Sequence, residues 1–233
     1  MNRFPREHEC QLEIPVLSGN QVYWSCLAAC WSLLLSILAG PFNCQEGRPM
    51  PLSKKLQELV DRISRQREKL LESVSGLTDA QLNYKAPETE WSISDVLNHV
   101  SLADEANAKL WSNYLKRARA TSPPPDPSPS ESVINSMDEI FPRMDGAKFQ
   151  APEFVTPQPN APVDESMARL TFSRERMLAN VEQLDGLDLS GLTFPHPLAG
   201  ALNAYQWILV AGAHEARHAA QINRMKSQPG FPE

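Results

Sequence analysis

The chain has 233 residues, of which 42% are hydrophobic and 21% are charged, so it can bury a substantial folded core. Its formal net charge at pH 7 is −6, and no dense cluster of lysine and arginine occurs, which argues against nucleic acid as a partner. Glycine is scarce and strand-like alternation of Val, Ile and Thr is rare, so the composition favours helices over β-sandwiches and barrels.

Residues 1–49 contain all four cysteines and the longest apolar run of the chain, residues 22–40. The run approaches the length that spans a bilayer, so it is a candidate membrane anchor or signal segment. Acidic residues outnumber arginines before it, which is unlike the positive start of a signal peptide. Met50 opens a stretch typical of a helical domain, so a start codon assigned too far upstream is another interpretation. A packed helix is the remaining one.

Residues 50–233 are expected to form the main folded domain, after a leader of doubtful origin at residues 1–49. This domain contains no cysteine, which suits a reducing compartment. We therefore expect a cytoplasmic protein. The alternative is a membrane-anchored protein, if residues 22–40 span a bilayer.

Four segments of this domain repeat hydrophobic residues at intervals of three and four, the spacing of amphipathic helices. Ser92 followed by Asp95 is the pattern of a capped helix start, and Gly186 is typical of the residue that closes a helix. The expected helices cover residues 53–76, 93–119, 163–184 and 203–226.

Residues 121–162 separate the second and third helices and hold ten of the twenty prolines. Because proline fixes φ and removes a hydrogen-bond donor, we expect an extended linker with one short helix around residues 132–141. A connection of this length inside a compact domain usually crosses the fold or covers a site. The pattern predicts an all-α four-helix bundle with a long Pro-rich crossover between helices two and three.

The last helix carries the sequence HEARH, in which His214 and His218 have the H-E-x-x-H spacing of zinc metalloproteases. The two histidines are one helical turn apart and share the apolar stripe, so both can face one ion in the interior. A metzincin protease needs a glycine and a third histidine further on, where this chain has Gln221 and Arg224. In the zinc proteases that use a glutamate as third ligand, this residue lies further downstream on another helix. The only carboxylate side chain after His218 is that of the terminal Glu233. The protease interpretation therefore fails.

A third ligand is available upstream. His99 lies on the interior stripe of the second helix, and the small residues Ala103 and Ala106 beside it leave room. Facing helices of a bundle commonly supply ligands to one central ion. We therefore predict that His99, His214 and His218 hold a divalent metal and leave an open position. Zinc is the default ion, although nickel, iron or manganese would suit the same ligands.

Glu215 is the candidate catalytic residue, as a general base acting on a water at the metal. Its Cα–Cβ direction lies about 80° from the mean direction of the two neighbouring histidines, so orienting an imidazole is an alternative role. We interpret Asp104 and Arg174 as solvent-facing side chains. His196 lies between two prolines in a turn and is expected to pack and hydrogen-bond locally.

Three stretches of the chain are similar to the DinB-like family of metal-binding four-helix bundles. They are EWSISDVLNHVSLADE at residues 90–105, FPHPLAGAL at residues 194–202, and AYQWILVAGAHEARHAAQI at residues 204–222. The resemblance covers roughly residues 52–226. It implies the same fold and the same three histidines as the metal ligands.

The resemblance also implies a divalent-metal-dependent enzyme that acts on a small-molecule substrate. The enzyme would be a hydrolase, or a thiol S-transferase with a low-molecular-weight thiol as co-substrate. The alternative is a bundle that binds a metal or a ligand and catalyses nothing, as a stress-related binding or dimerisation module. Because bundle faces pair readily, a homodimer is one expected assembly.

Overall fold

The computed structural model describes residues 51–85, 91–142 and 151–233. The chain divides into two units, residues 1–49 and 50–233, and every described residue belongs to the second. The leader with its apolar segment at residues 22–40 lies outside the described residues. None of the described helices is long and apolar enough to cross a membrane.

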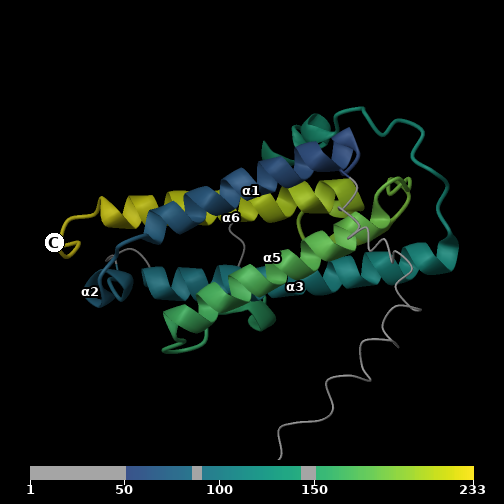
Figure 1. Cartoon of the computed structure of the whole chain (residues 1–233). Coiled ribbons are helices and arrows are strands. Elements are labelled where there is room, and N and C mark those ends of the chain that lie inside the picture. Colours follow the sequence, from purple (N-terminus) through teal and green to yellow (C-terminus); the bar gives the residue numbers. More distant parts are fainter. Residues whose placement is uncertain (1–50, 86–90, 143–150) are drawn as a thin grey trace, which may run out of the picture. The chain divides into compact units, whose positions relative to one another are not determined.

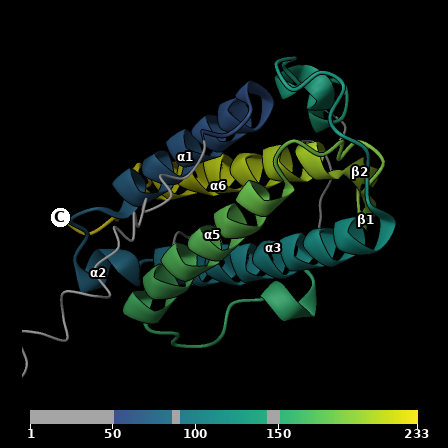
Figure 2. The same ribbon diagram turned by 45° about the vertical axis from the view of Figure 1, so that its right-hand side comes forward.

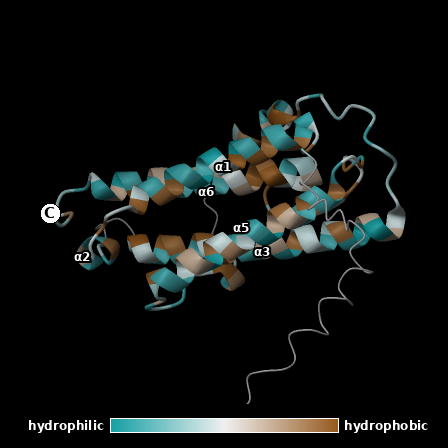
Figure 3. Ribbon diagram, viewed as in Figure 1, coloured by the Kyte–Doolittle hydropathy of each residue, from teal (hydrophilic) through white to brown (hydrophobic). Residues whose placement is uncertain are grey.

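Four long helices make up the unit, which confirms the predicted all-α bundle. Each helix carries both hydrophilic and hydrophobic residues, as Figure 3 shows, because only part of its surface faces the core. Their boundaries agree with the predicted ranges to within two residues, as is usual for helix ends. The helices are α1, Lys54–Val74; α3, Ile93–Thr121; α5, Val163–Leu184; and α6, Ala204–Lys226.

The four helices pack as two pairs, α1 with α6 and α3 with α5 (Figures 1 and 2). Within each pair the two helices run in the same direction, and the pairs run in opposite directions. A chain that leaves the end of α3 must therefore return to the other end of the bundle before α5 can begin. The long connection at residues 122–162 makes this return, so the bundle does not have the simple up-down order.

Polar side chains fix the starts of three helices. Ser92 accepts from the backbone N–H of Asp95, and the Asp95 carboxylate accepts from that of Ser92, so the predicted capping box is present. Asn203 and Gln206 form the same arrangement at the start of α6, and Ser53 caps α1. These caps set where each helix begins and thereby the height of its interior residues.

Several short elements lie between the helices. The turn before α6 is an antiparallel hairpin of β1, Thr193–His196, and β2, Gly200–Asn203, rather than an irregular loop. Its two prolines and short strands gave no alternating pattern to predict it from. The others are the single-turn helix α2, Asp79–Leu82, and the 3₁₀ turns η1, Ile134–Met137, and η2, Glu153–Val155.

The hydrophobic core consists of two clusters at different heights along the helices. One cluster centres on Leu59, Trp111 and Ile208, and the other on Leu70, Val96 and Ile222. A layer of charged residues, three of them buried and one partly exposed, interrupts this apolar interior. Each long helix contributes one of these residues, which falls between the two clusters in chain order. These residues are Arg67 on α1, Asp104 on α3, Arg174 on α5 and Glu215 on α6.

Candidate metal centre

The three predicted histidines meet in the bundle, His99 from α3 and the other two from α6. The Nε2 atom of His214 lies 3.2 Å from the Nε2 atom of His99 and 3.2 Å from that of His218. Each of the three histidines offers one ring nitrogen, and these three nitrogens all lie within 4.8 Å of one another. His99 and His218 are buried, and His214 is partly exposed. The structure thus brings together the residues that the sequence nominated as ligands, while their metal-binding role stays a prediction.

Hydrogen bonds on the far side of two rings fix their tautomers. The Nδ1 atom of His99 lies 2.7 Å from the carbonyl oxygen of Val155, and that of His218 lies 2.8 Å from the Oε1 atom of Gln221. Because both oxygens only accept, each Nδ1 must carry the proton and donate. Each Nε2 therefore presents a lone pair to the centre. Such partners orient the histidines in known metal sites.

Without an ion, the three imidazoles cannot satisfy one another. Two of the converging Nε2 atoms are acceptors, and a neutral His214 ring has a single proton to offer. If that proton is on Nε2 it can serve only one partner, and the Nε2 lone pair of the other partner, also 3.2 Å away, is left without a donor. The alternative tautomer of His214 carries the proton on Nδ1, which is buried without a hydrogen-bond partner among the described residues, and then presents a third lone pair at Nε2. A cation at the centre would receive all three lone pairs, so the residues fit a divalent metal.

The surroundings keep all three imidazoles uncharged at neutral pH. Burial lowers the pKa of His99. Burial, reinforced by the charges that His218 and His99 would carry, lowers the pKa of His214 well below its usual value. Burial and the proximity of His99 lower the pKa of His218 to about 4. Because only the neutral ring binds a metal, the ligand set is ready at pH 7 without losing protons.

Glu215 lies in a different environment from the two histidines that flank it. Its side chain is fully buried, and its Oε1 atom accepts from Arg67 at 2.8 Å and also from Arg174. Arg67 donates to Asp104 as well. Asp104 and Arg174 are thus not the solvent-facing side chains that we expected, because each has an oppositely charged partner inside the bundle. The general-base role of Glu215 stays a prediction, and these contacts favour a positioning role.

A pocket of about 600 Å³ opens beside the three histidines. Its walls are mainly apolar, with Trp91, Phe154 and Trp207 as the aromatic members, and the ring centre of Trp91 is 4.9 Å from that of His99. His196 lines the same pocket, with its Nδ1 atom accepting from two backbone N–H groups of its own turn, as expected for local bonding. A largely apolar pocket with a few polar groups is the usual form of a small-molecule site.

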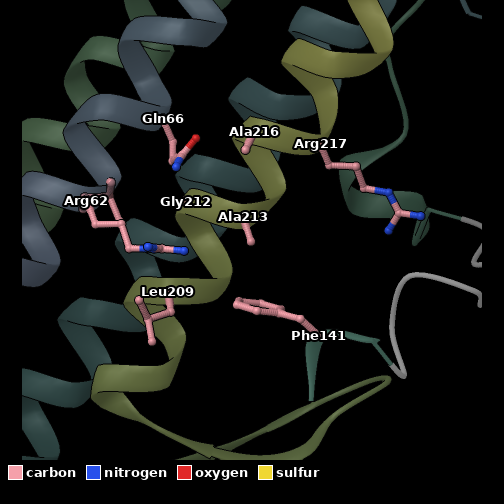
Figure 4. A pocket seen from close by; sticks show the side chains of 9 residues that line it. Arg62, Gln66, Phe141, Leu209, Gly212, Ala213, Ala216 and Arg217 are labelled. Carbon is pink, nitrogen blue, oxygen red and sulfur yellow. The ribbon is translucent and has the colours of Figure 1, made fainter. Parts of the chain in front are cut away.

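A second pocket, of about 400 Å³, lies between α1 and α6 (Figure 4). Gly212 allows this close approach of the helices, because a β-carbon there would stand 2.9 Å from a methyl group of Ile63. Arg62 and Arg217 line the pocket from the two helices. Figure 4 shows the Arg62 side chain reaching towards α6, while Arg217 reaches away from α1. Arg217 also lines the larger pocket, whereas Arg62 does not.

The chain is similar to known proteins over most of its length. A family model described as the DinB superfamily matches residues 62–222, which include all three histidines. The chain is 29% identical over 156 residues to a Bacillus subtilis (strain 168) protein named Uncharacterized protein YuaE, covering 66% of this chain and 89% of that protein. A crystal structure described as TT2238, a four-helix bundle protein, is 21% identical, covers 72% of this chain and 96% of that one, and gives a TM-score of 0.46.

Proposed function

The chain belongs to the DinB superfamily, and on that basis we propose that it is a divalent-metal-dependent enzyme acting on a small molecule. The proposed reaction is thiol S-transfer or hydrolysis at the three-histidine site, with zinc as the ion. The observation that carries the proposal is the convergence of three Nε2 atoms, two of which must be acceptors because their rings donate through Nδ1. A divalent cation would satisfy all of these nitrogens together.

The protein's own residues would hold, orient and enclose the reacting groups. His99, His214 and His218 would bind the ion, and Val155 and Gln221 keep two of the rings in the binding tautomer. The largely apolar pocket walls would enclose the substrate on one side of the site. When bound, a divalent ion makes a coordinated water or thiol more acidic at neutral pH and polarises a substrate oxygen.

The crossover between α3 and α5 supports S-transfer in preference to hydrolysis. Its η2 turn supplies the carbonyl of Val155 to His99, and Pro152 and Phe154 of the same segment line the pocket. One segment therefore both fixes a ligand and shapes the substrate space. The pocket volume of about 600 Å³ leaves room for a small thiol together with an electrophile.

Metal analysis combined with turnover tests the proposal. The full chain is purified, its bound metal is measured, and conjugation of low-molecular-weight thiols to 1-chloro-2,4-dinitrobenzene is followed beside hydrolysis of 4-nitrophenyl acetate. We expect one ion per chain, and turnover that His99→Ala abolishes together with the metal. His196→Ala is the matched control for metal content, because His196 lines the pocket outside the ligand group.

Each other outcome has a defined meaning. Metal bound by the native chain with no turnover on thiol or ester substrates would support a non-catalytic metal-binding bundle. Metal content that His99→Ala leaves unchanged would contradict the three-histidine site itself. Thiol conjugation without ester hydrolysis would select the S-transferase, and the reverse result would select the hydrolase.

A further inference from the structure

The pocket beside the three histidines has an unusual balance of charge for a protein whose formal net charge is −6. No Asp or Glu side chain is among its described lining residues. Arg217 is the single side chain of permanent charge among the described residues of the lining. The pocket is positive before any metal is bound.

Arg217 differs from the arginines of the interior because no partner for it occurs in the part of the chain that the structure describes. Its guanidinium group makes no hydrogen bond or ion pair with another described residue, whereas Glu215 accepts from both Arg67 and Arg174. Arg217 directly precedes His218 on α6 and lines the same pocket as the three histidines. A guanidinium group in this position can bind a carboxylate through paired hydrogen bonds.

The other walls of the pocket suit an apolar group of aromatic size. Trp91 lies against His99, and the ring centre of Trp207 is 5.2 Å from that of His196. Phe154 of the crossover is 70% exposed although it lines the pocket, so a bound molecule could cover apolar surface that the chain itself leaves open. Covering apolar area in this way stabilises a complex in proportion to the area removed from water.

We propose that the substrate of this site carries a carboxylate, or a similar oxoanion, that Arg217 binds, and an aromatic-sized apolar body that lies against Trp91, Trp207 and Phe154. The inference rests on the proposed function, because it names the substrate class of the same site. Arg217 would act as a specificity-determining residue, since it selects among substrates by their charge.

A matched pair of ligands tests this proposal without any need for turnover. The heats of binding of 2-naphthoate and of 2-naphthamide, which differ in charge but little in shape, are measured with the metal-free full chain. We expect 2-naphthoate to bind more tightly, and Arg217→Gln to weaken its binding by about fivefold while leaving 2-naphthamide unchanged, the range for a solvent-accessible ion pair. Arg62→Gln is the control, because Arg62 lines only the neighbouring pocket.

Two results would overturn the proposal. The first is equal binding of the two ligands by the native chain. The second is a preference for 2-naphthoate that survives in Arg217→Gln, or that exists only when zinc is present, since the carboxylate would then bind the ion and not Arg217. A chain that binds no metal but keeps the Arg217-dependent preference would instead contradict the proposed function and leave this inference standing.

Discussion

Arg67 and Glu215 form a buried ion pair that joins the first and last helices of the bundle, with 2.8 Å between the Nη2 and Oε1 atoms. Asp104 of α3 contacts the same guanidinium group, and Arg174 of α5 contacts the same carboxylate. All four long helices therefore contribute one ionisable side chain to a single cluster of two arginines and two carboxyl groups. Because Glu215 directly follows His214, this cluster fixes the height and rotation of α6 where it presents its ligands.

Replacing Glu215 by glutamine should destabilise the fold strongly. Arg67 and Arg174 would keep their charges in the interior without the shared carboxylate, and removing one partner of a buried pair costs about 3 kcal/mol or more. The free energy of unfolding is measured by urea denaturation of the metal-free chain. Glu105→Gln is the control, because Glu105 pairs with Lys109 on the surface and its loss should cost about 0.5 kcal/mol. Similar losses in both variants would contradict the structural role of the cluster.

Alanine at Gly212 should also destabilise the protein, although alanine favours helices over glycine by about 1 kcal/mol. A β-carbon there would stand 2.9 Å from the Cγ2 atom of Ile63 and 3.4 Å from its Cα atom, and α1 and α6 would have to separate. We expect a net loss of about 1–2 kcal/mol in the free energy of unfolding. Gly191→Ala, where nothing lies within 4 Å, should be neutral. A Gly212→Ala chain as stable as the native one would show that the helices are not packed this closely.

The helices could be predicted from the sequence because their information is local. Apolar spacing located the four long helices, and the pair Ser92 and Asp95 marked the start of α3. The hairpin at residues 193–203 could not be predicted in the same way. Each strand has four residues and the first contains a proline, so the pairing depends on the turn and on packing more than on alternation.

The site was predicted only in part, for a related reason. The spacing of His214 and His218 along one helix marked them as a pair of candidate ligands. His99 was recognised as the third candidate from its position on an interior stripe. The charged cluster depends instead on contacts between residues that lie far apart in the sequence. Arg67 is 37 positions from Asp104 and 148 positions from Glu215, and a single sequence carries no pairing signal over such separations. One clue was present. Arg67 lies four residues after Ile63 and three before Leu70, both fully buried, so it occupies an interior position of α1.

Acid should destabilise the metal-free protein over a defined range of pH. An unfolded histidine takes up a proton near pH 6.5, whereas folded His218 resists protonation until about pH 4. The free energy of unfolding should therefore fall as the pH drops from 6.5 to 4, by about 3 kcal/mol from His218 alone. His99 and His214 act in the same direction. Asp104 opposes them, because burial and the nearby Glu215 carboxylate raise its pKa to about 7, and its contribution is lost as the pH rises.

The pH dependence is tested with urea denaturation at a series of pH values. His218→Gln should reduce the slope between pH 6.5 and 4, because one of the groups that resist protonation is gone. An excess of zinc should stabilise the native chain at pH 7 and lose this effect as the pH falls, since protons compete with the ion for the rings. Identical slopes for the native chain and His218→Gln would contradict the assigned pKa of His218.

Gln221 should influence metal affinity although it is not a predicted ligand. Its Oε1 atom accepts from the Nδ1 atom of His218 at 2.8 Å, and loss of such an orienting contact lowers metal affinity by about 10- to 100-fold. Zinc affinity is measured by competition with a chromophoric chelator for Gln221→Ala and for Gln57→Ala. Gln57 is a suitable control because its side chain is exposed on α1 and donates a hydrogen bond to the neighbouring Asp61. Equal affinities in the two variants would exclude this orienting role.

The location of the ion itself tests the central claim most directly. Crystals of the full chain grown with zinc would be measured at the zinc absorption edge, where the anomalous signal locates the metal. We predict one strong peak about 2.0–2.1 Å from the Nε2 atoms of His99, His214 and His218, with the remaining position open to the pocket. No peak among the three rings, or a peak from which the His99 ring is turned away, would contradict the account.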